Sequence, residues 1–126
     1  MSDTYTCFDT VVSDGVATIT LNRPDKLNTM TPAFWSELPL LVRQIDATGE
    51  ARVVVLASTG RHFSAGMDLA VFGQGNGAEA VEVGRLRANL RANVLHLQDT
   101  FTALEKARMP VLAAIQGGCI GGAVDM

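Results

Sequence analysis

The chain has little cysteine, little histidine and no long apolar run. Its 126 residues include two cysteines, Cys7 and Cys119, and two histidines, and none of them forms a CxxC or paired-histidine motif. This scarcity argues against a structural zinc site and a disulfide framework, so no metal site is expected. No apolar segment approaches the roughly 18 residues of a membrane span, and the N-terminal MSDTYTCFDT resembles neither a secretory signal nor a transit peptide. We expect no membrane partner and a cytoplasmic location.

Positive charge is scarce as well. Ten Lys and Arg residues stand against 13 Asp and Glu residues, which gives a formal net charge of -3, and the basic residues are dispersed. A nucleic-acid partner is therefore not expected. Apolar residues are abundant, at 48% of the chain, which is enough for a core. We expect residues 1–126 to belong to a single domain.

The first half of the chain predicts a hairpin and then a helix. Residues 6–12 and 16–21 flank Asp14-Gly15, a pair suited to a tight hairpin turn. Thr31-Pro32 is typical of a helix cap followed by a first-turn proline. Pro39 should kink this helix or shift its start. One face of the predicted helix carries the apolar residues Phe34, Leu38, Leu41, Val42 and Ile45.

The second half predicts two further strands and a long helix. Residues 53–57 form a β-branched run, which is typical of a strand covered on both faces, and residues 58–66 form a loop. The Gly-, Gln- and Asn-rich residues 73–77 predict a mobile loop. Pro110 ends the helix that follows, and residues 111–115 predict a strand. That helix is predicted to face the core, with coiled-coil pairing as the alternative, because apolar residues recur every three or four positions at Leu86, Leu90, Val94, Leu97, Phe101 and Leu104. The alternation of strands and helices predicts an α/β fold with a parallel sheet.

Two predicted strands end in glycine-containing turns that lead into helices, RHFSAGMDL at residues 61–69 and GGCIGGAVDM at residues 117–126. Ligands collect at the carboxyl ends of strands in α/β sheets, and a helix N-terminus there offers unpaired N–H groups. Two such turns could supply two N–H donors to one carbonyl oxygen.

Asp125 lies three residues after Gly122, which is one helical turn if a helix begins near Gly121. Its carboxylate would then hang close to whatever the Gly122 N–H binds. An acid or base beside an oxyanion hole is what proton transfer next to a carbonyl requires, so the pattern suggests enolate chemistry. The alternative is that Asp125 is a first-turn acid favoured by the helix dipole.

The segments LNRPDKLNTMT, RHFSAGMDL and PVLAAIQGGCIGGAVDM resemble, in this order, the signatures of the crotonase (enoyl-CoA hydratase/isomerase) superfamily. The resemblance implies a spiral of ββα units that binds acyl-CoA and stabilises a thioester enolate between two backbone N–H groups. By motif position these donors are Met67 and Gly122, and the first acid is Asp125. The resemblance also implies that backbone groups hold coenzyme A, which is part of the substrate, so that no separate cofactor is expected. The implied substrate-binding residues are Lys26, Leu27, Ala65, Gly66, Asp68 and Gly121.

Within the superfamily, GGCIGG-x-VD most resembles the Δ3,5-Δ2,4-dienoyl-CoA isomerases. Hydratases have Glu at the position of Asp125, and aspartate has about 1.5 Å less reach. Ala123 stands where the family pattern has glycine. Family members are about twice as long and assemble as trimers or hexamers, and the isomerases take further acids from later in the chain. We therefore expect a truncated chain whose complete form is a homotrimer or hexamer.

Other residues have plainer interpretations. Asp68 is interpreted as a structural first-turn acid in preference to a catalyst. His62 is interpreted as a residue that orders the loop or contacts a CoA phosphate. Cys119 is not expected to act as a nucleophile because no histidine is near it in sequence. Ser64 lacks the G-x-S-x-G frame of a hydrolase. Lys26, like Arg23, either meets CoA phosphates or is simply solvated.

Three functions therefore remain open. The first is a crotonase-type enzyme, an isomerase or a hydratase, in fatty-acid β-oxidation. The second is a module that binds CoA esters without turnover, because the chain offers one acid at the expected site. The third is a non-catalytic fragment that reuses the fold. The intact turns and Asp125 favour the first.

Overall fold

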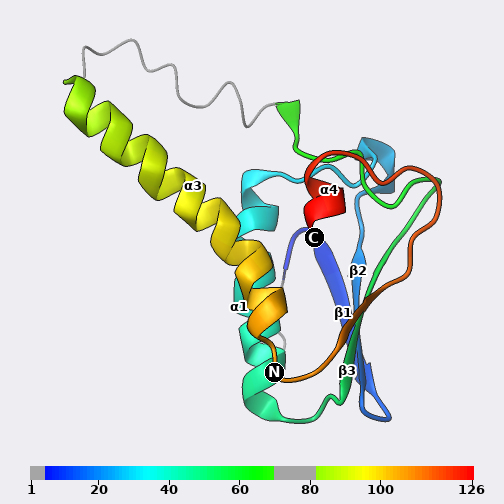
Figure 1. The fold of residues 1–126 in the computed structure, drawn as a ribbon. Helices are drawn as coiled ribbons and strands as arrows, with labels where there is room; N and C mark the ends of the chain where they lie inside the picture. Colours follow the sequence, from blue (N-terminus) through cyan, green and yellow to red (C-terminus); the bar gives the residue numbers. More distant parts are fainter. Residues whose placement is uncertain (1–4, 70–81) are drawn as a thin grey trace.

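The computed structural model describes residues 5–69 and 82–126. In chain order they form strands β1 (Phe8–Ser13) and β2 (Val16–Leu21), a 3-10 turn η1 (Pro24–Lys26), helix α1 (Pro32–Thr48), strand β3 (Val53–Ser58), helix α3 (Val83–Lys106), strand β4 (Val111–Ala113) and the short helix α4 (Gly122–Asp125). The predicted mobile loop at residues 73–77 lies outside the described residues. Figure 1 shows the sheet on one side of the molecule and the two long helices on the other.

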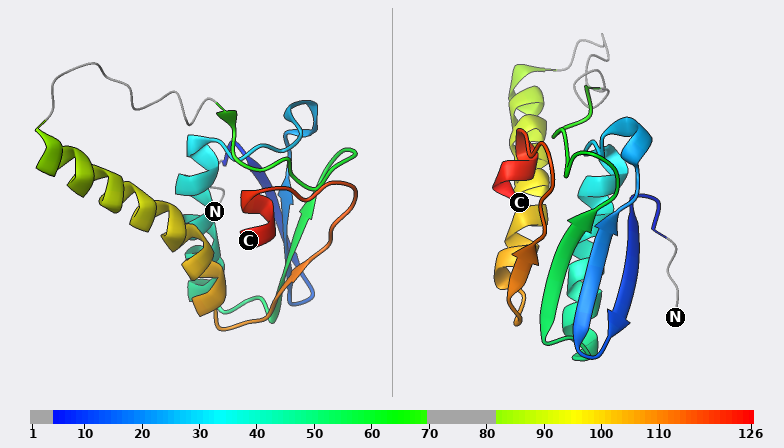
Figure 2. Two further views of the ribbon diagram at one scale, coloured as in Figure 1. Left: turned by 45° about the horizontal axis from the view of Figure 1, so that its top comes forward. Right: turned by 90° about the vertical axis from the view of Figure 1, so that its right-hand side faces the viewer.

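The four strands form one sheet in the order β1-β2-β3-β4. The predicted hairpin is confirmed, since β1 and β2 pair antiparallel and Asp14 and Gly15 have φ values of 53° and 80°. The pairs β2–β3 and β3–β4 are parallel. The sheet is therefore mixed, and its three parallel strands all end at the same edge (Figure 2).

Helix α1 covers the apolar face of the sheet. Thr31 caps it as predicted, because its side chain accepts a hydrogen bond from the N–H of Phe34. Pro39 does not shift the start of the helix, which runs from Pro32 through Pro39 to Thr48. The five predicted core residues of this helix are buried against Ala17, Ile19 and Leu21 of β2 and Val54 and Leu56 of β3.

The prediction that β3 is covered on both faces is wrong for the described residues. Val54 and Leu56 are buried, whereas Val53 and Val55 on the opposite face are only half-buried. A β-branched run reports high strand propensity, and propensity alone does not say how many faces are covered.

The prediction that α3 faces the core along its whole length is also wrong. Leu97, Phe101 and Leu104 pack against the core, but Leu86, Leu90 and Val94 are 54%, 63% and 42% exposed. Figure 1 shows the N-terminal half of α3 extending away from the sheet and α1. Helical periodicity identifies an apolar face and does not identify what covers it.

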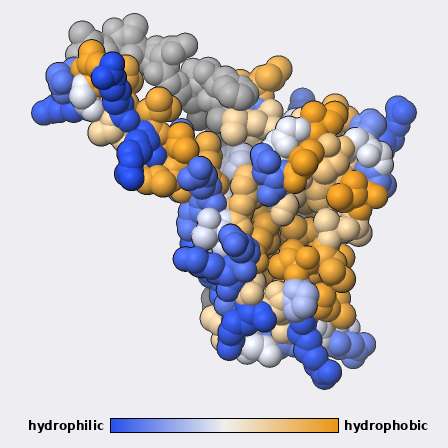
Figure 3. Space-filling model, in the orientation of Figure 1, coloured by the Kyte–Doolittle hydropathy of each residue, from blue (hydrophilic) through white to orange (hydrophobic). Residues whose placement is uncertain are grey.

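Strand β4 is shorter than predicted and carries exposed apolar residues. It ends at Ala113, and Leu112 and Ile115 are 56% and 54% exposed. Ile120 and Val124 are also exposed, and Figure 3 shows apolar residues gathered on this face of the molecule. Within residues 5–69 and 82–126, no helix is both long and apolar enough to cross a bilayer.

Candidate active site

Three loops meet at the carboxyl edge of the parallel strands. Residues 22–31 follow β2, residues 59–68 follow β3 and residues 114–121 follow β4. Because the strands are parallel, these loops emerge at one edge of the sheet, and Figure 1 shows them gathered beside α4. The convergence expected from the sequence is therefore present in the structure.

The middle loop is bonded to the first loop by three backbone hydrogen bonds. The N–H of Ala65 donates to the carbonyl of Leu27 at 3.0 Å. The N–H of Met30 donates to Gly66 at 2.8 Å, and the N–H of Asp68 donates to Met30 at 3.0 Å. This pattern makes Met30 and Met67 partners in an isolated parallel bridge.

The middle loop is also bonded to the third loop. The N–H of Ser64 donates to Gly118 at 3.3 Å and the N–H of Ile120 donates to Ser64 at 3.1 Å, which pairs Ser64 with Cys119. The amide of Gly118 donates to Nδ1 of His62 at 2.8 Å. His62 therefore orders these loops, which agrees with the first interpretation given to it. His62 thus lies beside the turn that contains Cys119, although the two residues are distant in sequence. Nδ1 of His62 accepts the hydrogen bond from Gly118 and is therefore already used.

Gly66 lies at the closest approach of the two glycine turns. Its φ is +91°, and a Cβ at this position would lie 2.6 Å from the carbonyl oxygen of Ile120. The Cα of Gly66 lies 3.8 Å from the Cβ position of Gly121. Only a residue without a side chain permits this contact, so glycine at position 66 keeps the two turns together.

The amides of Met67 and Gly122 remain without acceptors. Within the described parts of the chain, neither N–H donates a hydrogen bond. The bridge to Met30 uses the carbonyl of Gly66 and the N–H of Asp68, so the N–H of Met67 is directed away from Met30. Gly122 is the first residue of α4, where a helix leaves its N–H groups unpaired.

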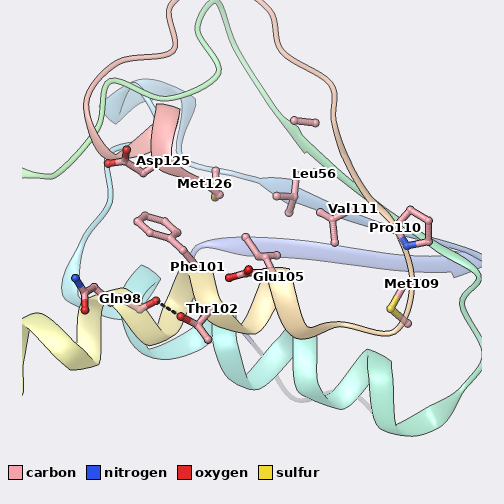
Figure 4. Close-up of a pocket in the computed structure, with 12 residues that line it drawn as sticks. Leu56, Gln98, Phe101, Thr102, Glu105, Met109, Pro110, Val111, Asp125 and Met126 are labelled. Atoms are coloured by element: carbon pink, nitrogen blue, oxygen red, sulfur yellow. Dashed lines mark hydrogen bonds between the residues drawn. The ribbon is translucent and has the colours of Figure 1, made fainter.

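Asp125 lies one turn after Gly122, at the end of α4. The helix begins at Gly122 with Gly121 as its N-cap, close to the expected start. The carboxylate is exposed and makes no hydrogen bond with residues 5–69 or 82–126. It lies at the rim of a cavity of about 670 Å³ between α3, β4 and α4, beside Met126 (Figure 4).

Lys26, Leu27 and Ala65 lie where the first two loops join. Lys26 is exposed, and Leu27 is 48% exposed with a φ of 56°. The backbone N–H and C=O groups of both residues are already hydrogen-bonded within η1 and to residues 29 and 65. The N–H of Ala65 is used as well, whereas its carbonyl accepts no hydrogen bond from the described residues. Among the N–H and C=O groups of these three residues, the carbonyl of Ala65 alone makes no hydrogen bond with the described residues, and the carbonyls of Lys26 and Leu27 each accept one.

Asn28 is a residue of this region that the sequence reasoning missed. It is 1% exposed with a φ of 50°, and its side chain donates to the carbonyls of Thr59 (2.7 Å) and His62 (3.2 Å). Its Oδ1 accepts from the N–H of Arg23 at 2.9 Å, and its carbonyl accepts from Oγ of Ser64 at 2.8 Å. Asn28 thus fastens the first loop to the middle one. The sequence carried one indication of this role, because asparagine at a turn tolerates the left-handed backbone region better than most residues.

Asp68 and Ser64 make hydrogen bonds within the joined loops. Asp68 accepts a hydrogen bond from Oγ1 of Thr29 at 3.0 Å. Ser64 is fully buried, and its Oγ accepts from the N–H of Gly66 at 3.1 Å. In the part of the chain that the structure describes, no three His, Cys, Asp or Glu residues are grouped as metal ligands.

The fold and the paired turns define a crotonase-type α/β protein. The profile of the enoyl-CoA hydratase/isomerase family matches residues 12–126, and the chain belongs to this family. The mitochondrial Δ(3,5)-Δ(2,4)-dienoyl-CoA isomerase of Mus musculus is 41% identical over 112 residues, covering 86% of this chain and 33% of that protein. The peroxisomal enzyme of the same name from Arabidopsis thaliana is 35% identical over 108 residues, covering 84% of this chain and 39% of that protein.

Solved structures agree with this assignment. An enoyl-CoA hydratase from Shewanella pealeana superposes with a TM-score of 0.81 at 26% identity, covering 95% of this chain and 43% of that one. The chain spans about a third of the length of the first curated relatives it matches. Those relatives are named as mitochondrial and peroxisomal, so the expectation of a cytoplasmic location is wrong. The N-terminal composition on which it depended is no guide to the compartment.

Proposed function

We propose that the complete protein acts on acyl-CoA thioesters and that the amides of Met67 and Gly122 donate hydrogen bonds to the thioester oxygen. The observation that carries the proposal is that two turns from different strands touch at Gly66 and Gly121, while the amides of Met67 and Gly122, each next to the contact, donate no hydrogen bond within the described residues. Two fixed N–H groups stabilise the charge that develops on a carbonyl oxygen in an enolate. CoA would be part of the substrate, and no separate cofactor is proposed.

Asp125 is proposed to move a proton beside this carbonyl. Its place one turn after Gly122 and its lack of a hydrogen-bond partner among the described residues leave the carboxylate available. The preferred reaction is isomerisation of a 3,5-dienoyl-CoA to the 2,4-isomer, because the relatives of highest identity given above bear that name. When the double bonds move, a proton leaves C2 and a proton arrives at C6. A second proton-transfer group is required, and no residue of this chain is proposed for it.

The alternative reaction is hydration of a 2-enoyl-CoA, which the name of the Shewanella pealeana structure favours. A further alternative is a CoA-ester-binding module without turnover. Hydration requires water at the acid, and the exposed side chain of Asp125 is open to water in the described residues.

Assembly of the complete protein into a homotrimer or hexamer is also proposed, and the mass of the native particle in solution tests it.

The test is turnover by the protein expressed from its complete coding sequence. A shift of the diene absorbance to longer wavelength with 3,5-dienoyl-CoA supports the isomerase, because the 2,4-diene is conjugated with the thioester carbonyl and the 3,5-diene is not. Loss of enoyl absorbance with 2-enoyl-CoA supports the hydratase. Asp125→Asn should lower kcat by roughly 10²-fold or more and leave the affinity for a saturated acyl-CoA nearly unchanged.

Asp14→Asn is the matched control, because Asp14 lies in the β1–β2 turn and asparagine tolerates its positive φ. Binding without turnover would leave the CoA-ester-binding module as the function, and absence of binding would refute the isomerase, the hydratase and the module. Equal kcat for Asp125→Asn and Asp14→Asn would show that Asp125 has no part in the chemistry.

A further inference from the structure

Met30 contacts both turns that carry the proposed donors. It is fully buried at 0% exposure. Its N–H and C=O bond to Gly66 and Asp68, on either side of Met67, at 2.8 and 3.0 Å. Its side chain reaches the other turn, where Sδ lies 3.0 Å from the position that a Cβ on Gly122 would occupy.

These two contacts fix different quantities. The backbone bridge sets the direction of the Met67 amide, because N–H groups alternate in direction along an extended segment. The thioether sets how closely Gly122 approaches, because the helix start packs directly on it. Both donors of an oxyanion hole must lie within about 2.7–3.1 Å of one oxygen, so their separation tolerates little error.

We propose that Met30 is a positioning residue that sets the separation of the Met67 and Gly122 amides. This inference rests on the proposed function, since the separation matters only if both amides bind one oxygen. Met30 touches no reacting atom in this role. It acts through its backbone on one donor and through its side chain on the other.

Met30→Ala tests the side-chain contact, because it retains the backbone bridge and removes the thioether beneath Gly122. In the protein expressed from its complete coding sequence, kcat should fall by roughly 10- to 100-fold and KM should change less than about threefold. Met30→Leu fills nearly the same volume and should restore most of kcat. Ile45→Ala is the control, because Ile45 is buried in the same core near the other end of α1. It should lower the melting temperature by an amount similar to Met30→Ala and leave kcat within about twofold of the parent.

A second readout does not depend on turnover. The C=O stretch of a saturated acyl-CoA labelled at its carbonyl should shift to lower frequency on binding to the parent protein. Met30→Ala should lose most of this shift, whereas Met30→Leu and Ile45→Ala should keep it. A purely structural role would lower the melting temperature without changing the shift.

The outcomes separate the two claims. Absence of both turnover and carbonyl shift in the parent protein would refute the proposed function and this inference with it. A parent that shows both, together with a Met30→Ala variant that keeps its kcat and its shift, would refute only the role of Met30. Equal losses in Met30→Ala and Ile45→Ala would also refute it, because general destabilisation would then explain the effect.

Discussion

Thr100 of α3 donates its Oγ1 hydrogen to the main-chain carbonyl of Trp35 in α1, at 3.1 Å. Trp35 lies four residues before Pro39, which has no N–H to offer that carbonyl. Thr100 is fully buried, so water does not reach the bond. A hydroxyl from the neighbouring helix thus supplies the hydrogen bond that proline removes, and it docks α3 on α1.

Thr100→Val should destabilise the protein by about 1–3 kcal/mol, because the same shape is kept while the buried Trp35 carbonyl loses its donor. Pro39→Ala gives residue 39 an N–H that can bond to Trp35. In that background Thr100→Val should cost clearly less, which chemical denaturation of the four proteins measures. Thr102→Val is the control, since Thr102 bonds to Gln98 within its own helix. Equal costs of Thr100→Val with and without Pro39 would contradict the compensation.

Gly66→Ala should separate the two turns of the candidate site. The new Cβ would meet the carbonyl oxygen of Ile120 at 2.6 Å, and the φ of +91° adds strain. Gly49→Ala is a matched control, because Gly49 has a φ of +69° and nothing within 4 Å of its Cβ position. Gly49→Ala should cost about 1 kcal/mol from the backbone alone.

The measurements for this pair are the free energy of unfolding and the affinity for a saturated acyl-CoA. Gly66→Ala should lose more stability than Gly49→Ala and should also bind more weakly. The contact between the turns would be unimportant if both variants lost the same stability and kept the same affinity.

Asn28→Ala should loosen the joint between the first two loops. It removes both side-chain donations and the acceptor for the Arg23 amide, and it places alanine at a φ of 50°. The expected loss is on the order of 3 kcal/mol, because the part-buried carbonyl of Thr59 and the amide of Arg23 lose their partners and alanine is strained at this φ. Asn22→Ala, which removes only a 3.3 Å bond to Asp9, should cost far less. Hydrogen exchange of the loop amides would then quicken in Asn28→Ala alone, and uniform protection in both variants would contradict this role.

The convergence of the loops could be predicted from the sequence because it follows from chain order. Parallel strands at residues 53–58 and 111–113 deliver their following turns to one edge, whatever the side chains are. The hairpin at Asp14-Gly15 and the cap at Thr31 were likewise predictable, since each depends on residues adjacent in sequence.

Features that depend on distant partners could not be predicted. The periodicity of α3 is the same at Leu90 and at Leu104, yet one is 63% exposed and the other is buried. Thr100 sits in that helix like any threonine, and only its contact with Trp35 reveals its role. Met30 has no chemical signature either, because its place between two turns is a property of the fold.

Acid should loosen the contact between α1 and α3. A hydrogen bond from Arg108 holds the pKa of the Asp46 carboxyl below its ordinary value of 3.8, and a hydrogen bond from Arg43 does the same for the pKa of Asp99. The pair Arg43–Asp99 joins α1 to α3, and the pair Asp46–Arg108 joins α1 to the second residue after α3, each with an N–O distance of 2.7 Å. These pKa values are lower in the folded protein than in the unfolded chain. As the pH falls, the unfolded chain therefore binds more protons than the folded protein does. Their contribution is therefore complete above about pH 5 and is lost below about pH 4, as the pH falls through the folded pKa values.

The urea midpoint of unfolding should be level between about pH 7 and pH 5 and should drop as the pH falls below about 4. The midpoint of a variant with Asp46→Asn and Asp99→Asn should drop less steeply over the same range. High salt should reduce the difference between the parent and the double variant, since both ion pairs are largely exposed and are screened. Parallel curves for the parent and the double variant below about pH 4 would show that other carboxylates govern acid unfolding.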